Sequence, residues 1–224
     1  MYVIQSYTRL TITWNNKFSK ISFHINRRRL TKLERLNLDN NKYNSSIFKS
    51  LKEFPSLKIL DLSNNDFHRS LHTQDINALK NLEDLDLSGN SFEYFVSSTI
   101  LSGCCELRKL QELMLIKNQL DGTLPPCLKN LTSLNLVDLS QNRLIANIGS
   151  SSLLSALTSL KYLLIFGNSF EIPSSFRFFA NHTKLRGIYA NGNKAIITEI
   201  ELQSWVPKFQ LDFFNLLCLV AVDF

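Results

Sequence analysis

One eleven-residue pattern recurs along most of this chain and limits what the chain can fold into. An apolar residue, usually leucine, stands at the first, fourth and sixth positions, and asparagine stands at the ninth. Full copies begin at Leu33, Leu57, Leu82, Leu110, Leu134, Leu160 and Leu185, and a partial copy begins at Leu211. The starts lie 24 to 28 residues apart. This spacing indicates a chain of similar structural units stacked on one another.

The pattern has a simple physical explanation. Side chains alternate along a strand, so the fourth and sixth residues point to one side, and the first leucine enters the same core from the preceding bend. Each unit then buries about three aliphatic side chains, worth roughly 1.5 to 3 kcal/mol apiece. The ninth-position asparagine is expected to satisfy backbone groups where the chain turns out of the strand.

These features predict an α/β fold of the leucine-rich repeat class, whose periods run from about 20 to 29 residues. We expect a solenoid, or horseshoe, of about seven to eight repeats with a parallel β-sheet on its concave side. The convex side should be irregular and partly helical. Each repeat completes its core only against its neighbours, so stability is shared between repeats.

The net charge of +6 is unevenly distributed. Residues 1–32 hold seven lysines and arginines and no acidic residue, whereas residues 33–224 hold 18 basic and 19 acidic groups. We therefore divide the chain into a basic N-terminal segment, 1–32, and a leucine-rich repeat domain, 33–224, whose last repeat is incomplete. Alternation in LTITW and SKISFHI permits strands in the first segment. We favour a solvated extension or a cap paired with the first repeat over a nucleic-acid or membrane-surface patch.

Two stretches carry a resemblance to a known family. The fourth repeat continues as NQLDGTLPPCLKNLTSL, which has the LxGxxP extension of plant-specific leucine-rich repeats. Together with LPPCLKNLTSL, the later IELQSWVPKFQL resembles the ectodomains of plant receptor-like proteins, which are cell-surface receptors without a kinase. The resemblance implies a second small strand on the side of the solenoid, and non-enzymatic recognition of a protein or peptide ligand in immune or developmental perception. It also implies a co-receptor kinase as partner and a place on the extracellular side of the plasma membrane.

The sequence departs from that family in its targeting segments. The first 30 residues contain no apolar run long enough for a secretory signal, and the most apolar stretch, 216–222, is too short to span a bilayer. We interpret the chain as an ectodomain fragment without a membrane segment.

The candidate ligand-binding surface follows from the third, fifth and seventh positions of each repeat, which face away from the core. In the first three repeats these positions are polar and mostly acidic. From the fourth repeat onward they become apolar and aromatic, as large protein-binding patches often are. The candidate binding residues are Met114, Ile116, Leu136, Tyr162, Leu164, Phe166 and Tyr189.

Covalent modification is expected at two kinds of site. Asn44, Asn130 and Asn181 begin Asn-x-Ser/Thr sequons outside the strands, and are candidate glycosylation sites. Cys127 lies about one repeat after Cys104 and Cys105, so stacking can bring it next to either of them. We predict a disulfide between Cys105 and Cys127, with Cys104 as the alternative partner.

Few residues in the sequence support catalysis or metal binding. His68 and His72 have helical i, i+4 spacing, but a solvated loop explains them better than a metal site, and His182 lies in no ligand pattern. The acidic pair Asp84 and Asp86 belongs to one strand face. We predict neither an enzyme nor a cofactor, and neither a catalytic residue nor a nucleic-acid partner. Two other functions compete with the receptor: a secreted inhibitor of pathogen polysaccharide hydrolases, and the repeat domain of an intracellular immune sensor.

Overall fold

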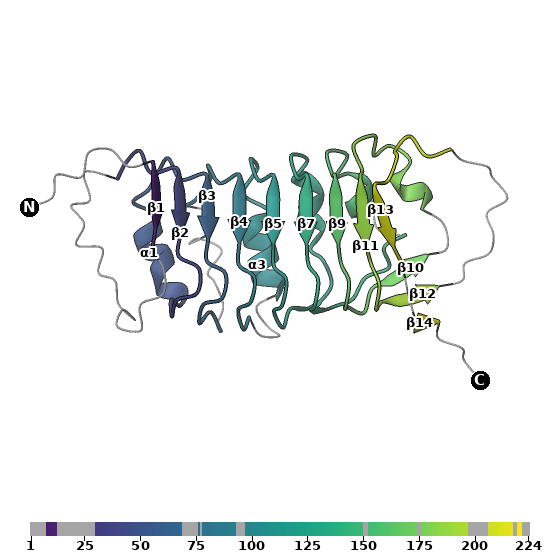
Figure 1. Ribbon diagram of the computed structural model, residues 1–224, viewed down its shortest axis with the longest axis horizontal. Helices are drawn as coiled ribbons and strands as arrows, with labels where there is room; N and C mark the ends of the chain where they lie inside the picture. Colours follow the sequence, from purple (N-terminus) through teal and green to yellow (C-terminus); the bar gives the residue numbers. More distant parts are fainter. Residues whose placement is uncertain are drawn as a thin grey trace, which may run out of the picture.

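The repeats form a solenoid whose strands lie side by side in one long sheet (Figure 1). The computed structural model describes residues 8–12, 30–68, 76, 78–92, 97–149, 152–173, 176–196, 206–216 and 219–220. The sheet has nine strands in the order β1-β2-β3-β4-β5-β7-β9-β11-β13, and every pairing is parallel. The predicted fold class is confirmed.

Each strand of the long sheet is three residues long. The strands are β1 (Arg9–Thr11), β2 (Arg35–Asn37), β3 (Ile59–Asp61), β4 (Asp84–Asp86), β5 (Glu112–Met114), β7 (Leu136–Asp138), β9 (Tyr162–Leu164), β11 (Gly187–Tyr189) and β13 (Phe213–Asn215). In the repeats that begin at residues 33 to 211, the strand covers the third to fifth positions. Equivalent positions stand next to each other because the register does not shift between neighbours.

Short helices cover one side of the long sheet (Figure 1). They are η2 (Ser45–Ile47), α1 (Phe48–Leu51), α3 (Ser97–Cys104), η4 (Pro126–Asn130), α4 (Ser152–Ser155) and η5 (Arg177–Phe179). The α4 helix packs against both η4 and η5, so successive helical segments are stacked in the same way as the strands.

Two smaller parallel sheets lie beside the solenoid. One pairs β6 (Asp121–Gly122) with β8 (Arg143–Leu144), and the other joins β10 (Glu171–Pro173), β12 (Lys194–Ile196) and β14 (Leu219–Val220). The strand β6 contains Gly122 of the LxGxxP extension, which confirms the second strand that the resemblance implied. Asn147, just after β8, forms a bridge with Glu171 of β10, and the amide of Ser169 donates to the carbonyl of Leu144 in β8.

The strand β1 lies inside the segment that we separated as residues 1–32. It pairs with β2 in register, Leu10 beside Leu36, and Ile12 donates its amide to the carbonyl of Asn37. Leu10 and Ile12 are spaced like the fourth and sixth residues of a repeat, although the first position of that frame is Tyr7 instead of leucine. The long sheet therefore extends across the predicted boundary between residues 32 and 33.

In the seven full repeats the core contains the first, fourth and sixth residues, as predicted, whereas Phe214 at the fourth position of the partial repeat is 49% exposed. Leu33, Leu36 and Leu38 of the first repeat are fully buried, and so are their equivalents in the next repeats. The eleventh position adds a second row: Phe67 packs on Phe92 with ring centroids 5.7 Å apart, and Phe48 of α1 packs on Phe67 at 5.9 Å. This row is continuous across neighbouring repeats and contributes to the stability of each interface.

The ninth-position asparagines act as backbone connectors, as predicted. The side-chain amide of Asn142 donates to the carbonyls of Leu115 and Leu139, both at 2.9 Å, and its Oδ1 accepts the amide of Leu120 at 3.0 Å. Asn65 and Asn168 make equivalent bonds. Each asparagine thus binds main-chain groups of its own repeat and of the preceding one.

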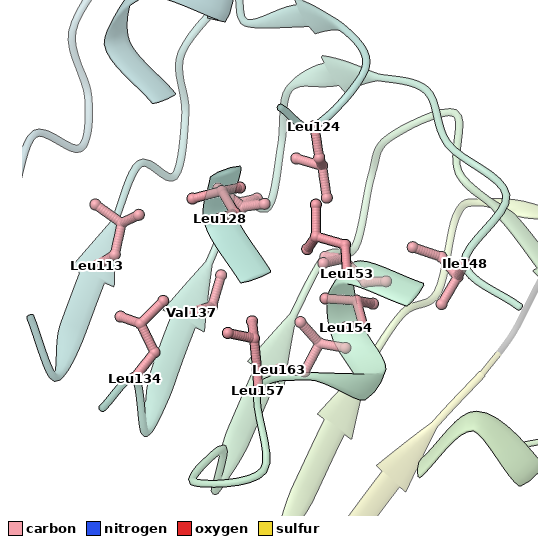
Figure 2. Close-up of a pocket in the computed structure, with 12 residues that line it drawn as sticks. Leu113, Leu124, Leu128, Leu134, Val137, Ile148, Leu153, Leu154, Leu157 and Leu163 are labelled. Carbon is pink, nitrogen blue, oxygen red and sulfur yellow. The ribbon is translucent and has the colours of Figure 1, made fainter. Parts of the chain in front are cut away.

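A small apolar cavity of about 20 Å³ lies in the core between the fourth and sixth repeats (Figure 2). All of its lining residues are leucine, isoleucine or valine, including Leu113, Val137 and Leu163 on adjacent strands. Val137 occupies the fourth position, where its two neighbours carry the larger leucine. The cavity is thus explained by one undersized side chain.

Replacing Val137 with isoleucine is expected to raise the free energy of unfolding by about 0.8 kcal/mol, because one added carbon fills space that is already dry. Isoleucine keeps the β-branch that suits a strand. Urea unfolding followed by circular dichroism measures the change. Val137→Ala is the matched control and should lower stability by enlarging the cavity. A Val137→Ile protein that is less stable than the wild type would show that the cavity does not accept a methyl group.

Candidate functional site

The candidate surface is the face of the long sheet that points away from the leucine core, which we call the open sheet face. It is the face predicted to be concave, and it is made by the third, fifth and seventh positions of the repeats. The seven candidate residues all lie there, on or just after β5, β7, β9 and β11, and all are half-buried. Their neighbours on adjacent strands cover part of each side chain, and the remainder faces outward.

The strand register decides which candidate residues are adjacent. The third-position row runs Glu112, Leu136, Tyr162, Gly187, Phe213, and the fifth-position row runs Met114, Asp138, Leu164, Tyr189, Asn215. Leu136 therefore stands next to Tyr162, and Leu164 stands next to Tyr189. Met114 is separated from Leu164 by Asp138, so it lies at the margin of the apolar area.

Two aromatic pairs dominate the C-terminal part of the open sheet face. The rings of Tyr162 and Phe213 stack, with centroids 5.9 Å apart and planes 4° from parallel. Phe166 meets Tyr189 edge to face at 4.8 Å. Such pairs add about 0.5 to 1.5 kcal/mol beyond their burial and hold the rings in fixed orientations.

Phe213 and Gly187 are functional candidates that the sequence analysis missed. Tyr162 and Phe213 are two strands apart, with β11 between them. A Cβ on Gly187 would overlap the Phe213 ring, so the absence of a side chain there lets the ring lie across β11 toward Tyr162. Phe213 is also 41% exposed, more than is usual for so large an apolar side chain. The repeat frame from Leu211 puts Phe213 at the third position and could have identified it.

Acidic side chains occupy the adjoining part of the same face. They are Asp61, Asp84, Asp86, Glu112 and Asp138. Burial raises the pKa of Asp84, and Glu112 and Glu83 add to that effect while Arg35 opposes it. Burial also raises the pKa of Asp86; bonds from Ser88 oppose the shift, and the charges of Asp61 and Asp138 add to it. The carboxylates therefore repel one another in partly desolvated positions.

Some of these carboxylates also have a structural role. Asp61, Asp86 and Asp138 accept the amide of the serine two residues further on, at 3.0, 2.8 and 2.9 Å. This local turn ends each strand. Asp84 and Asp86 lie on one face of β4, as predicted, and both are half-buried. The strand pairing holds these like charges close together although they repel one another.

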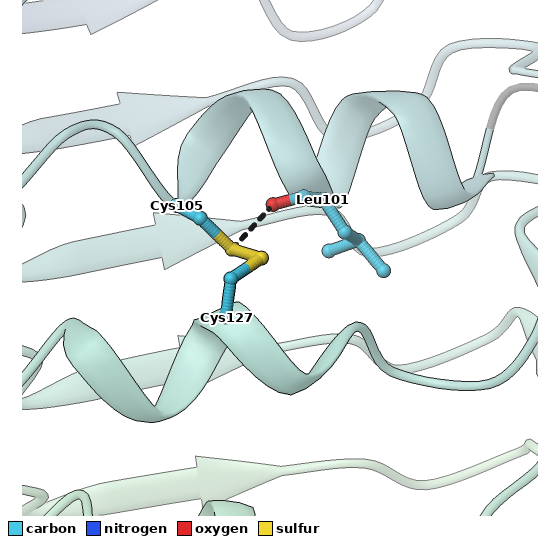
Figure 3. The surroundings of a disulfide bond; sticks show 3 residues. All are labelled: Leu101, Cys105 and Cys127. Carbon is cyan, nitrogen blue, oxygen red and sulfur yellow. Dashed lines mark hydrogen bonds between the residues drawn. A yellow bond between two sulfur atoms is a disulfide. The ribbon is translucent and has the colours of Figure 1, made fainter.

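A disulfide joins Cys105, just after α3, to Cys127 in η4, with Cα atoms 5.7 Å apart (Figure 3). The sulfur of Cys105 lies 3.2 Å from the carbonyl oxygen of Leu101. The alternative partner, Cys104, is a free and fully buried thiol whose pKa burial raises to about 12. A thiol in that state is unreactive, because the thiolate is the reacting form.

The three sequon asparagines are exposed. The Oδ1 of Asn44 accepts the amide of Ser46 at 3.1 Å and caps η2. Asn130 ends η4, and Asn181 follows η5 at an equivalent place, since each precedes the first leucine of the next repeat by four residues. None of the three belongs to the open sheet face.

The histidines differ in position. His68 is exposed, whereas His72 lies outside the described residues. Within the described ranges, no group of three or more His, Cys, Asp or Glu side chains is arranged to hold a metal ion. His182 is fully buried, contacts the ring of Phe179 at 4.9 Å, and places its Nε2 3.0 Å from the carbonyl oxygen of Leu154. No feature of the repeat pattern predicted this role of His182 in the core.

The burial of His182 makes stability depend on pH. Burial lowers the pKa of His182, while nearby carbonyls oppose the shift. When the pH falls below the histidine pKa of the unfolded chain, about 6.5, the unfolded chain binds a proton that the folded state resists. The free energy of unfolding should therefore decrease. His182→Gln should remove this decrease between about pH 7 and pH 5, and the exposed control His68→Gln should retain it. Identical pH profiles for wild type and His182→Gln in urea unfolding would contradict the prediction.

The fold and the surface define a leucine-rich repeat protein, and comparison with known proteins agrees. The family model described as Leucine Rich Repeat matches residues 56–79, 81–107 and 109–131. The ectodomain of the plant membrane receptor kinase GASSHO1/SCHENGEN3 from Arabidopsis thaliana has a similar fold, with a TM-score of 0.63 and 23% identity. The alignment covers 85% of this chain and 22% of that chain. That similarity supports the fold alone.

The sequence relatives of this chain are plant receptor-like proteins, as the resemblance suggested. Cuscuta receptor 1 from Solanum lycopersicum is 48% identical over 122 residues, which are 54% of this chain and 11% of the relative. Receptor-like protein 1 from Arabidopsis thaliana is 35% identical over 193 residues, which are 74% of this chain and 17% of the relative. The chain thus spans less than a fifth of these two relatives. In the part of the chain that the structure describes, no helix is both long and apolar enough to cross a membrane.

Proposed function

We propose that this chain is a recognition module that binds a protein or peptide ligand through the open sheet face, without catalysis. The observation that carries the proposal is the contiguous apolar surface on β7, β9, β11 and β13, with its two aromatic pairs. Apolar surfaces that contain rigid aromatic side chains are typical centres of protein interfaces. The candidate residues Met114 and Ile116 form the margin of this surface.

The related proteins favour this function. The names of the sequence relatives describe receptors, and the structurally similar GASSHO1/SCHENGEN3 ectodomain was solved in complex with CASPARIAN STRIP INTEGRITY FACTOR 2. We propose that signalling passes to a partner kinase, as the resemblance to kinase-less receptor-like proteins implies. We propose no cofactor and no nucleic-acid partner.

The covalent features support a place on the extracellular side of the plasma membrane. The Cys105–Cys127 disulfide suits an oxidising compartment. The exposed asparagines of the three sequons can accept glycans there, and their positions leave the open sheet face free. Asn44, Asn130 and Asn181 are accordingly our proposed glycosylation sites.

A peptide-display selection tests the proposal. The whole chain is immobilised, random dodecapeptides are selected on it, and the affinities of enriched peptides are measured by fluorescence anisotropy. The variant Tyr162→Ser, Phe166→Ser, Tyr189→Ser should bind these peptides at least about tenfold more weakly, since it removes most of the aromatic surface. Single Phe213→Ser is a milder second variant, because that ring is already exposed.

The matched control replaces exposed apolar residues elsewhere, Ile145→Ser and Val206→Ser, and should bind like the wild type. Circular dichroism verifies that each variant is folded. Unchanged affinity in the triple variant would show that the open sheet face is not the binding surface.

A further inference from the structure

The open sheet face consists of two regions of different chemistry that share a border. The acidic region comprises Asp61, Asp84, Asp86, Glu112 and Asp138. The apolar region comprises Leu136, Tyr162, Leu164, Phe166, Tyr189 and Phe213. The regions adjoin in register, because Glu112 stands beside Leu136 and Asp138 stands beside Leu164.

The acidic region lacks neutralising charge. At the third, fifth and seventh positions of the repeats that begin at residues 33 to 185, Arg35 is the only basic residue. Burial and then mutual repulsion raise the pKa values of Asp84 and Asp86, while Arg35 opposes the shift at Asp84 and bonds from Ser88 oppose it at Asp86. A bound cationic group would relieve this repulsion. Its attraction to the carboxylates is stronger where these are partly shielded from water.

The apolar region determines the other half of the ligand. The stacked pair Tyr162 and Phe213 and the edge-to-face pair Phe166 and Tyr189 offer ring surfaces to an aromatic or large aliphatic side chain. A purely basic ligand would leave this surface in water, and a purely apolar ligand would leave the carboxylates unpaired.

The spacing of the strands sets the distance between the basic and the apolar parts of the ligand. Neighbouring strands are about 4.8 Å apart, so Glu112 and Tyr162, two strands apart, are separated by about 10 Å, and Asp84 and Phe213, five strands apart, by about 24 Å. An extended peptide advances about 3.3 Å per residue. These spans correspond to about three and about seven residues.

We propose that the open sheet face binds an extended peptide segment in which a lysine or arginine is separated by three to seven residues from an aromatic or large aliphatic residue. The basic side chain lies over β4 and β5, and the apolar side chain lies over β9 to β13. The segment crosses the strands along the length of the solenoid. This inference depends on the proposed function and specifies its ligand class.

The dodecapeptide selection tests the composition of the ligand. Peptides enriched on the wild-type chain should contain Lys or Arg at the stated separation from Phe, Tyr, Trp or Leu. On the variant Asp84→Asn, Asp86→Asn, Glu112→Gln, the basic residues should no longer be enriched while the apolar residues remain. Asparagine at residue 86 keeps an oxygen for the Ser88 amide, so the variant preserves the turn. Glu112→Gln alone is a second, milder variant.

A peptide of defined sequence measures how strongly the open sheet face prefers a basic ligand. The peptide Lys-Arg-Ser-Gly-Ser-Phe-Ser-Leu-Tyr, labelled with a fluorophore, should bind the wild type at least about tenfold more tightly than its Glu-Glu counterpart, and its affinity should decrease between about 50 mM and about 300 mM NaCl. The variant Asp84→Asn, Asp86→Asn, Glu112→Gln should lose most of this preference. The control variant Asp66→Asn, Glu106→Gln, Asp212→Asn removes the same charge from exposed positions outside the acidic region and should retain it.

The outcomes separate the two proposals. Enrichment of apolar residues without basic residues, or equal binding of both probes, would overturn the bipartite ligand and leave the proposed function intact. Enriched peptides that bind the serine triple variant as well as the wild type would overturn the proposed function. Failure to enrich any peptide would overturn both.

Discussion

Replacing Asn142 with alanine is expected to lower the free energy of unfolding by about 3 kcal/mol. Asn142 is buried, accepts the amide of Leu120, and donates to the carbonyls of Leu115 and Leu139. These two carbonyls also accept from Asn118 and Asn168. Alanine leaves the Leu120 amide without its acceptor in a core that water does not reach, which costs roughly 1 to 3 kcal/mol. It also removes one side-chain donor from each of the two carbonyls, and each lost hydrogen bond is worth about 1 kcal/mol. Urea unfolding of the whole chain measures the loss.

Local hydrogen exchange is a second measurement of the effect of Asn142→Ala. Hydrogen exchange of the Leu120 amide should accelerate in the Asn142→Ala protein, because its acceptor is removed. The control Asn130→Ala, made in unglycosylated protein, changes an exposed asparagine and should alter stability by less than about 0.5 kcal/mol. A loss of similar size in both variants would mean that Asn142 is not a special connector between repeats.

The double variant Cys105→Ala, Cys127→Ala is expected to lose about 3 kcal/mol of stability. The disulfide closes a loop with a sequence separation of 22 residues, and constraining a loop of that size in the unfolded chain is worth roughly 3 kcal/mol. The bond also fixes the end of α3 to η4, on the helical side of the third and fourth repeats. Urea unfolding of oxidised protein gives the comparison.

Reduction provides the internal control for the disulfide. A thiol reductant should bring the wild type close to the stability of the double variant and should leave the double variant unchanged. Buried Cys104 is present in both proteins and does not contribute to the difference. Equal stability of the oxidised wild type and the double variant would contradict the prediction.

The repeat frame allowed much of the fold to be predicted because leucine and asparagine positions reflect requirements within one strand and its next neighbour. The parallel sheet, the burial of the first, fourth and sixth positions, and the role of residues such as Asn142 all follow from that local pattern. The alternation in LTITW permitted the strand β1 and its pairing with the first repeat, but its agreement with the repeat frame was missed because Tyr7 replaces the first leucine.

Other features could not be read from single repeats. The Phe213 ring reaches Tyr162 only because Gly187 lies between them, which is a relation among three repeats. The burial of His182 depends on how the segment after η5 packs against Leu154 and Phe179. The half-burial of Asp86 arises from neighbouring strands, whereas the sequence pattern shows only that it alternates with core leucines.

The contact across Gly187 has a consequence for how such surfaces diversify. Repeat arrays are often regarded as modular, so that exchanging one unit would transfer one portion of specificity. Here the Phe213 ring from one unit occupies space above the preceding unit and contacts the unit before that. Recombination that moved the unit containing Phe213 without the unit containing Gly187 would place the ring against a Cβ. In this part of the array, inheritance of the aromatic surface is therefore tied to at least three consecutive units.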